Sequence, residues 1–376
     1  MKTGGRATVA VNRCGSYDKE ELAGAITGAL EPFGGMREFA GAGRRVLLKP
    51  NMLSAKDPSR AITTHPLFVE AVIDLVREAG GEPVIGDSPG GAVRGIRRVW
   101  DNTMMSDLAG RTSCELVNFE ASGTETVDTG ICRFFVARPV LEADAVINLP
   151  KLKTHSLTLL TCAVKNMFGV LPGFRKAEMH KLFPKPAPFS RMLVELYRNV
   201  RPALNIVDGV MAMEGDGPSS GKPRLTGIVA AGTDAVAVDA VMARVIGFDP
   251  AGIDTIRIAG EEGLGTADPS LIDVTGDAAD YRDEGFSLPS NTGMRLIPGP
   301  LARLVAPLVW LRLEIDEEAC TSCGMCYRSC PVKAVRKRGE GFAIDRDECV
   351  RCMCCHELCP ENAIEIKLSW LARKFI

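Results

Sequence analysis

Eight of the thirteen cysteines in this chain fall into two short runs near its C-terminal end, and both runs have the same spacing. Each run reads C-x2-C-x2-C-x3-C-P. In bacterial iron–sulfur proteins this spacing holds two [4Fe–4S] clusters, with the fourth cysteine of each run ligating the other cluster. The first run is Cys320, Cys323, Cys326 and Cys330, and the second is Cys349, Cys352, Cys355 and Cys359. We therefore predict two [4Fe–4S] clusters.

The same rule assigns the ligands. One cluster takes Cys359 with the first three cysteines of the first run, and the other takes Cys330 with the first three of the second run. The runs are a duplicated unit offset by 29 residues, and the repeat includes Pro331 and Pro360. Two zinc knuckles are the alternative, but zinc needs four ligands per site and gives no reason for the third C-x2-C step.

Two further residues lie within the second run. Cys354 fits neither register, so we interpret it as a bystander packed near a cluster, with a ligand swap with Cys355 as the alternative. His356 is read as a solvated loop histidine, and the alternative is a histidine that tunes the cluster through a hydrogen bond to sulfur.

Residues 312–366, which contain both runs, resemble the bacterial two-cluster ferredoxin domain. The resemblance implies a small α+β domain that transfers electrons, and it implies a redox partner protein. The potential of such clusters spans roughly −700 to +450 mV, so the spacing does not fix the direction of electron flow.

Composition excludes some function classes. The 45 basic and 47 acidic residues give a net charge of −2, which provides no bulk attraction to nucleic acid. The other well-separated cysteines suggest no disulfide framework, and with thiolate clusters they indicate a reducing, anaerobic cytoplasm. They are Cys14, Cys114, Cys132 and Cys162. Met1–Val11 lacks the apolar run of a signal peptide, and no transmembrane helix is expected.

Two apolar segments flank the cysteine-rich region. Residues 296–313 are broken by three prolines and carry two arginines, so we expect a connector helix that packs on the main domain. The tail at 368–376 is amphipathic and basic. For both segments docking within the protein or to a partner is the favoured role, and contact with a membrane surface is the alternative.

The first 270 residues alternate strand and helix patterns, which predicts an α/β fold with a layered, mostly parallel sheet. The expected strands are 7–12, 45–50, 83–87, 115–119, 145–150, 203–208 and 226–232. The expected helices are 19–30, 66–79, 92–107, 190–198 and 236–246. Open sheets of this kind bind ligands at the carboxyl ends of their strands, and several of these strands run into polar or glycine-rich loops.

Two of these loops carry candidate binding residues. Lys49 and Asn51 follow an apolar strand, and the turn after the next strand contains Asp87, Ser88 and Gly90. Exposed amides in such a turn bind a phosphate or carboxylate, although a simple strand-to-helix turn explains the pattern equally well. The chain contains neither G-x-G-x-x-G nor G-x-x-x-x-G-K-[ST], which disfavours a dinucleotide site or a P-loop.

A third loop carries candidate catalytic residues. Lys151, Lys153 and His155 alternate after an apolar strand, so an extended backbone projects them to one side. Two ammonium groups beside an imidazole favour an anionic substrate, with His155 as a proton carrier. Solvated lysines are the alternative.

Two more segments complete the candidate set. Residues 164–180 concentrate Lys165, Asn166, Lys176 and His180 around glycines and a proline, which is typical of a lid or substrate-binding turn. Asp208 lies in a later loop with Glu214 and Asp216, where the carboxylates form a proton-transfer site, a divalent-metal site or ion pairs. Other polar residues have weaker claims: Asp234 and Asp239 are expected to cap or orient a helix, and His65 to close a helix N-terminus.

The motifs KPN, TTHP, GDSPG, NLPKLKTH, VKNMFG, DGVMAMEGDGP and AGTDAVAVD together resemble the family called domain of unknown function 362, whose members include iron–sulfur proteins with a C-terminal ferredoxin module. The resemblance covers residues 8–250 and implies no reaction. We expect the family domain at 1–275, a linker and connector helix at 276–311, and the ferredoxin-like domain with its tail at 312–376.

These features suggest three functions. The first is a ferredoxin-coupled oxidoreductase acting on a small anionic substrate, with Lys151, Lys153 and Lys165 holding the anion and His155 or His180 supplying protons. The second is an electron-carrier subunit that docks a redox partner. The third is a metal- or cofactor-handling protein. One-electron clusters usually reduce organic substrates through a flavin or metal, and the sequence carries no fingerprint of either.

Overall fold

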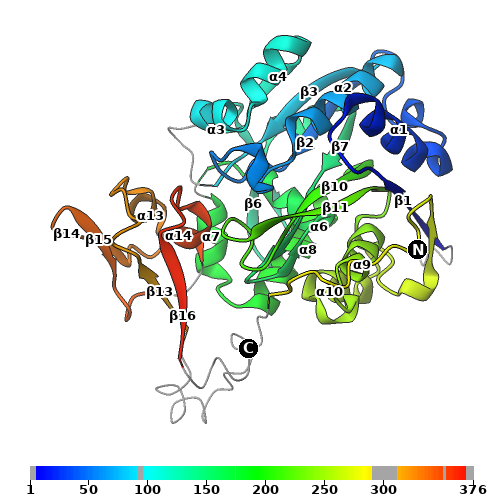
Figure 1. Cartoon of the computed structure of the whole chain (residues 1–376). Coiled ribbons are helices and arrows are strands. Elements are labelled where there is room, and N and C mark those ends of the chain that lie inside the picture. Colours follow the sequence, from blue (N-terminus) through cyan, green and yellow to red (C-terminus); the bar gives the residue numbers. More distant parts are fainter. Residues whose placement is uncertain (1–5, 91–95, 174, 290–310, 350–352, 370–376) are drawn as a thin grey trace.

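The computed structural model describes residues 6–90, 96–173, 175–289, 311–349 and 353–369. Most of the described chain forms an α/β body, and the cysteine-rich end forms a small module beside it (Figure 1). The fold class predicted from the periodicity is thus confirmed. No helix within these ranges is both long and apolar enough to cross a membrane.

The body is built on a ten-stranded sheet whose main path runs β12-β1-β11-β10-β7-β2-β3-β4. Only β11 is antiparallel to its neighbours on this path. Two short strands extend the sheet beside β10. The strands are β1 (Ala7–Arg13), β2 (Arg45–Pro50), β3 (Glu82–Asp87), β4 (Glu115–Asn118), β7 (Ala145–Leu149), β8 (Lys151–His155), β9 (Leu159–Thr161), β10 (Leu204–Glu214), β11 (Lys222–Gly232) and β12 (Ile272–Thr275).

Helices cover both faces of the sheet, because successive strand residues point to opposite sides. Leu47 belongs to one hydrophobic core, whereas Val46 and Leu48 belong to the other. The second of these cores includes α1 (Lys19–Leu30), α2 (Pro66–Glu78), α3 (Ile96–Asn102) and α4 (Met105–Thr112). The first includes α5 (Arg138–Glu142), α6 (Ala163–Asn166), α7 (Arg175–Leu182), α8 (Pro186–Asn199), α9 (Ala235–Val245) and α10 (Asp254–Glu261).

The expected elements of the body are present, with local differences. The helix expected at 92–107 is two helices, because Met104 takes a left-handed conformation between them, and residues 91–95 lie outside the described ranges. Asp234 caps α9 and His65 caps α2, as expected. The hairpin of β5 (Thr124–Asp128) and β6 (Arg133–Ala137) was not predicted.

The order of the strands creates a crevice. From β2 the chain steps through β3 to β4 at one edge, whereas β7 lies on the other side of β2 and leads to β10. Ligands of open α/β sheets bind outside the carboxyl ends of the strands at such a reversal. The residues that follow β2 and β7 therefore occupy the expected binding position.

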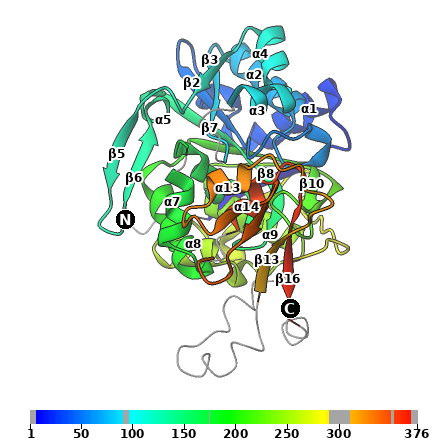
Figure 2. The same ribbon diagram turned by 90° about the vertical axis from the view of Figure 1, so that its left-hand side faces the viewer.

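The described residues of the cysteine-rich module form two antiparallel strand pairs and two short helices. They are β13 (Leu311–Ile315) with β16 (Ile364–Leu368), β14 (Val335–Arg338) with β15 (Gly341–Ile344), α13 (Met325–Ser329) and α14 (Cys354–Leu358). The helices lie towards the body (Figures 1 and 2). Most of the expected connector and tail lies outside the described residues, while 276–289 packs on the body through the Asp283–Arg224 ion pair.

Candidate functional site

The structure groups the cysteines of the module into two rings, and each ring draws on both runs. One cavity is lined by four thiols, which are those of Cys320, Cys323, Cys326 and Cys359. The other is lined by Cys330, Cys349, Cys354 and Cys355, while Cys352 lies outside the described residues. This is the exchange of fourth ligands that the spacing predicts.

The two fourth cysteines have the same backbone environment. Ala334 N donates a hydrogen bond to Cys330 Sγ at 3.1 Å, and Ala363 N donates to Cys359 Sγ at 3.2 Å. Amide hydrogen bonds to sulfur are typical of the surroundings of iron–sulfur clusters. The cysteines that line the two cavities are therefore of the type that binds iron–sulfur clusters.

The predicted environment of His356 is wrong. The residue is buried on α14, and its Nδ1 lies 2.6 Å from the carbonyl oxygen of Ile364 in β16. The helix brings it inside the module because the residues around it, Cys355 and Cys359, face the core. Cys354 is also buried and lines the same cavity as Cys355, so the bystander and the ligand swap both stay predictions.

In the body, a cavity of about 50 Å³ lies at the carboxyl ends of β2, β3 and β9. Seven of its lining residues were candidates from the sequence: Asn51, Asp87, Ser88, Gly90, Lys153, Lys165 and Asn166. The other lining residues are Leu53, Thr161, Phe168, Gly169, Lys176 and Pro218. We call this space the inner cavity.

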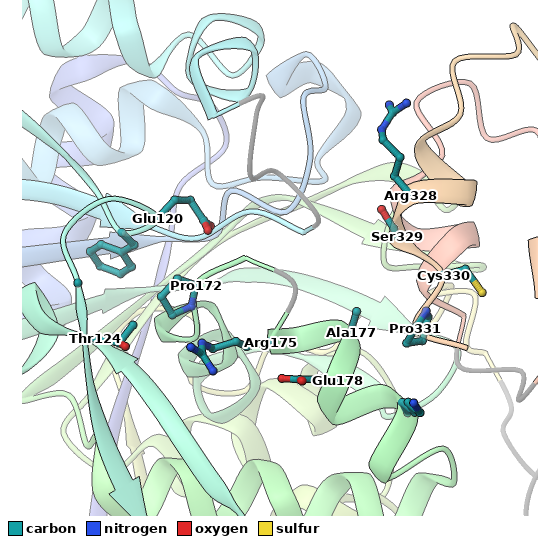
Figure 3. A pocket seen from close by; sticks show the side chains of 13 residues that line it. Glu120, Thr124, Pro172, Arg175, Ala177, Glu178, Arg328, Ser329, Cys330 and Pro331 are labelled. Atoms are coloured by element: carbon teal, nitrogen blue, oxygen red, sulfur yellow. The ribbon is translucent and has the colours of Figure 1, made fainter. Parts of the chain in front are cut away.

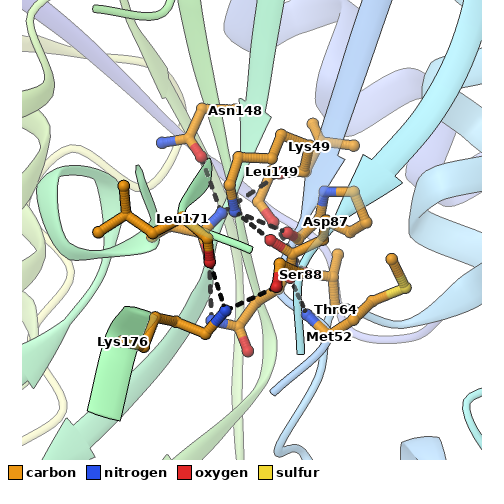
Figure 4. A network of polar contacts seen from close by, with 12 residues as sticks. Lys49, Met52, Thr64, Asp87, Ser88, Asn148, Leu149, Leu171 and Lys176 are labelled. Atoms are coloured by element: carbon orange, nitrogen blue, oxygen red, sulfur yellow. Dashed lines mark hydrogen bonds and ion pairs between the residues drawn. The ribbon is translucent and has the colours of Figure 1, made fainter. Parts of the chain in front are cut away.

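A buried ion pair borders the inner cavity. Lys49 Nζ lies 2.7 Å from Asp87 Oδ1, and both side chains are almost fully buried. Lys49 also donates to the Pro50 carbonyl, and Asp87 Oδ2 accepts from Met52 N at 2.7 Å (Figure 4). Burial lowers the pKa of Lys49, and the adjacent Asp87 carboxylate opposes this shift.

Gly169 is required where the chain passes this pair. A Cβ at this position would lie 2.0 Å from Asp87 Oδ1 and 2.7 Å from Lys49 Nζ. Only glycine lets the backbone approach so closely. The glycine in the segment VKNMFG therefore has a direct steric role at the site.

A ladder of asparagines joins neighbouring strands beneath the cavity. Asn51 Nδ2 donates to Asn166 Oδ1 at 2.9 Å, and Asn166 Nδ2 donates to Asn148 Oδ1 at 2.8 Å. Asn148 Nδ2 in turn donates to Asn205 Oδ1 at 2.9 Å. Each amide both donates and accepts, so the ladder fixes the ends of β2, β7 and β10 relative to α6.

Three more lysines line the inner cavity. Lys153 Nζ donates to the Ile62 carbonyl at 2.6 Å and to Asn51 Oδ1 at 3.1 Å. Lys165 Nζ lies 5.7 Å from the centre of the Phe168 ring. Lys176 Nζ donates to Ser88 Oγ at 2.7 Å and to the Leu171 carbonyl at 2.6 Å (Figure 4). Burial lowers the pKa of Lys176 to about 8.

Lys151 and Asp208 form a separate cluster that does not line the inner cavity. Their ion pair is 2.8 Å long and fully buried, and Tyr17 Oη bonds to both side chains at 2.8 Å. The ring of His65 stacks on that of Tyr17 with centroids 3.7 Å apart. This cluster joins β8, β10, α2 and the chain before α1, which gives it the geometry of an internal brace.

The two histidines chosen as proton carriers are both buried, and neither is among the residues that line the inner cavity. His155 Nδ1 accepts from Leu157 N at 3.0 Å. The His180 ring stacks on Phe189, with centroids 4.3 Å apart, and meets Phe168 edge-on. The structure thus places neither imidazole in the lining of the inner cavity.

The divalent-metal alternative for the later loop finds no support. Glu214 pairs with Arg224, Asp208 pairs with Lys151, and Asp216 is exposed. Among the described residues of the α/β body, no group of three or more histidine, cysteine or acidic side chains is arranged to hold a metal ion. Of the three alternatives, ion pairs describe Asp208 and Glu214.

A larger cleft of about 760 Å³ separates the body from the module. Figure 3 shows Glu120, Arg175 and Glu178 of the body on one side and Arg328 and Cys330 of the module on the other. We call this space the outer cleft. It was not predicted, because its walls come from segments about 150 residues apart in the chain.

Comparison with known proteins agrees with this arrangement. The family model described as "Domain of unknown function (DUF362)" matches residues 46–244, which is more than half of the chain. The chain belongs to the DUF362 family. A second model, described as "4Fe-4S dicluster domain", matches residues 312–360.

One curated relative of this DUF362 protein is the "Thylakoid-associated protein sll1697" of Synechocystis sp. (strain ATCC 27184 / PCC 6803 / Kazusa). The two are 40% identical over 270 residues, which is 71% of this chain and 82% of the relative. Among solved structures, the lactate racemase apoprotein from Thermoanaerobacterium thermosaccharolyticum matches with a TM-score of 0.43 and 12% identity. That match covers 63% of this chain and 56% of the other, and it carries no argument about activity.

Several site residues of this DUF362 protein were missed in the sequence. Thr161 and Phe168 look like core residues, and Glu120 stands alone after a strand. Lys176 was noted as part of the segment 164–180 but was given no role of its own. Its role depends on the contact with Ser88 in the turn after β3. No signal in the sequence indicates this contact, because the two residues are brought together only by the three-dimensional fold.

Proposed function

We propose that this protein is an iron–sulfur oxidoreductase that passes electrons from its ferredoxin module to a small anion bound in the inner cavity. The observation that carries the proposal is the contact between the cavity wall and the cluster-bearing helix. Gly90 lines the cavity, and a Cβ at Gly90 would lie 2.3 Å from Cδ2 of Leu358. Leu358 is the last residue of α14 and directly precedes Cys359.

The charges around the inner cavity favour an anion. Lys153, Lys165 and Lys176 line it, and Lys49 pairs with the lining residue Asp87. The second carboxylate nearby, that of Glu120, accepts a hydrogen bond from the lining residue Ser88. A cluster of cations with fewer carboxylates binds a negatively charged ligand when water is excluded. Thr161 Oγ1 supports this view, because it is buried and has no hydrogen-bond partner among the described residues.

The size of the cavity limits the substrate. One water needs about 10–15 Å³ of such volume, so about 50 Å³ holds an anion of only a few non-hydrogen atoms. A short carboxylate or an inorganic oxyanion fits this limit. A nucleotide does not.

The two rings of cysteines would hold the clusters. One ring comprises Cys320, Cys323, Cys326 and Cys359, and the other Cys330, Cys349, Cys355 and, from its spacing, Cys352. Each bound cluster supplies one electron at a time. The chain's own residues bind the anion, exclude bulk water and supply protons.

A second candidate function is that of an electron-carrier subunit with no substrate of its own. The outer cleft supports it, because Cys330 and Pro331 of a cysteine ring line a cleft of about 760 Å³ that is large enough to admit part of a partner protein. In that case the inner cavity is an anion site that stabilises the fold.

The test is anaerobic reconstitution with iron and sulfide, reduction with dithionite, and reoxidation by a panel of short carboxylates and oxyanions followed by visible absorbance. We expect one or more anions to reoxidise the clusters. Thr161→Val and Lys153→Met should each slow this at least tenfold with iron content unchanged. Glu178→Gln, which changes a residue of the outer cleft only, is the matched control. Reoxidation by a protein partner and by no anion would replace the oxidoreductase with the carrier.

A further inference from the structure

A line of hydrogen bonds connects the outer cleft with the inner cavity. Glu120 lines the outer cleft, and its Oε1 accepts from Ser88 Oγ at 2.5 Å. Ser88 lines the inner cavity, and its Oγ accepts from Lys176 Nζ at 2.7 Å. Glu120 and Lys176 are thus the two ends of a three-residue line that crosses the wall between the two spaces.

We propose that Glu120, Ser88 and Lys176 form a proton path from the outer cleft to the inner cavity, in which Lys176 is the proton donor to the bound anion. The proposal rests on the proposed function. An anion that accepts electrons in a buried cavity becomes more negative, and protons delivered to it neutralise this added charge. It names a route for those protons that passes through neither His155 nor His180.

The proton transfers balance along the path. The Lys176 ammonium gives one proton to the ligand and becomes a neutral amine. The Glu120 carboxylate then takes a proton from water in the outer cleft. It passes this proton to Ser88 Oγ while the Ser88 hydroxyl proton moves to the amine, so that Lys176 is again an ammonium group and Glu120 again a carboxylate. The path carries protons only, and the electrons come from the ferredoxin module.

The charges that face Lys176 suit this role. Glu120 and Asp87 stabilise its ammonium form, and Lys49 opposes it. Its own helix carries Arg175, Glu178 and Lys181, which line the outer cleft. Burial is the largest cause of the shift, and together with these groups it lowers the pKa of Lys176 to about 8. Lys176 is therefore protonated at neutral pH and gives up its proton readily.

A purely structural role for the same contacts must be separated from a proton path. Gly173 N donates to both Ser88 Oγ and Glu120 Oε1, so the three groups also hold the loop before α7 in place. Glu120→Gln keeps the shape and the acceptor oxygen but cannot carry a proton. Glu178→Gln removes an exposed carboxylate that lines the same cleft and lies outside the path.

The first experiment measures, as a function of pH, reoxidation of the reduced protein by the short carboxylate or inorganic oxyanion that reacts fastest in the panel. We expect Glu120→Gln to lower the rate at least tenfold above pH 7 and small weak acids to restore much of it. Anion affinity and cluster content should stay within twofold of the wild-type values. Glu178→Gln should behave as the wild-type protein. An unchanged pH profile in Glu120→Gln would overturn the path.

A second experiment needs no substrate. The ¹⁵Nζ resonance of Lys176, assigned by its loss in Lys176→Arg, should titrate near pH 8 in the holoprotein and at lower pH in Glu120→Gln, because a stabilising carboxylate is lost. If Lys176 titrates like a surface lysine in both proteins, the path is wrong even where an anion reoxidises the clusters. If the coupling is present but no anion reoxidises them, the oxidoreductase proposal alone has failed.

Discussion

The α/β body and the ferredoxin module are held together in different ways. The body has two large hydrophobic cores, one on each face of its sheet. Among the described residues of the module, the core has eight buried residues, of which Cys326, Cys355 and Cys359 are proposed cluster ligands. A domain of this size is only marginally stable by apolar burial, and part of this core consists of cluster ligands. We therefore expect the module to depend on bound clusters and the body not to.

The largest expected effect is therefore loss of the module alone when iron is removed. Anaerobic chelation should unfold the described residues from 311 onwards. The cysteines then lose their bonds to iron, which stabilise the module in place of a large hydrophobic core. Hydrogen exchange followed by mass spectrometry should show full exchange in α13 and α14 within seconds. Peptides from α9, which is buried along most of its length, serve as the internal control and should stay protected. Equal loss of protection in both regions would contradict the comparison.

The second effect tests the body at its buried ion pair. Asp87→Asn leaves the Lys49 ammonium buried without its counter-charge, and breaking such a pair typically costs about 3–5 kcal/mol. The free energy of unfolding of the body, measured in urea, should fall by that amount. Arg6→Ala breaks the ion pair with Asp273, in which both side chains are about half exposed, and should cost less than about 1 kcal/mol.

The contrast between the two regions also explains what the sequence could reveal. Cluster ligands are local, so the spacing around Cys320 and Cys349 predicted both rings before any fold was known. The inner cavity is assembled from β2, β3, β9 and α7, and each piece alone resembles an ordinary strand end. Lys49 and Asp87 were candidates because they follow apolar strands. Their pairing depends on strand order, which periodicity does not encode.

Some errors have the same origin. The alternation of Lys151, Lys153 and His155 was interpreted as one substrate-facing row. In the structure Lys151 turns to Asp208 and Lys153 to Asn51, because β8 leaves the main path of the sheet and pairs with β10. Side chains at successive positions of β8 therefore meet different neighbouring segments. Alternation in the sequence alone does not show this.

A smaller effect is expected where the chain passes the ion pair. Gly169→Ala forces a methyl group against Asp87, and overpacking of this kind costs about 1–3 kcal/mol. Gly24→Ala is the matched control, because its Cβ meets no atom within 4 Å and it lies within α1. That control should gain up to about 1 kcal/mol from helix propensity. Urea unfolding of both variants measures the difference, and equal effects would show that Gly169 has no steric role.

The smallest expected effect is a dependence of the stability of the body on pH, caused by His65. Burial lowers the pKa of His65 in the body to about 4, against about 6.5 in an unfolded chain. Between these values the unfolded chain binds more protons than the native body, so the free energy of unfolding decreases as pH falls from 6.5 to 4. Because His65 is partly exposed, we expect a loss of about 1 kcal/mol.

A single substitution isolates this contribution of His65. His65→Asn removes the titrating ring, and asparagine is among the best residues at a helix N-cap, so α2 keeps its start. Asp239, whose pKa is raised to about 7 by burial, acts in the opposite direction over the same pH range, since the native protein then binds the extra proton. The wild-type curve alone therefore mixes two opposed slopes. The difference between wild-type and His65→Asn unfolding in urea at pH 7 and pH 4.5 cancels Asp239, and a difference that does not change with pH would show that His65 is protonated equally in both states.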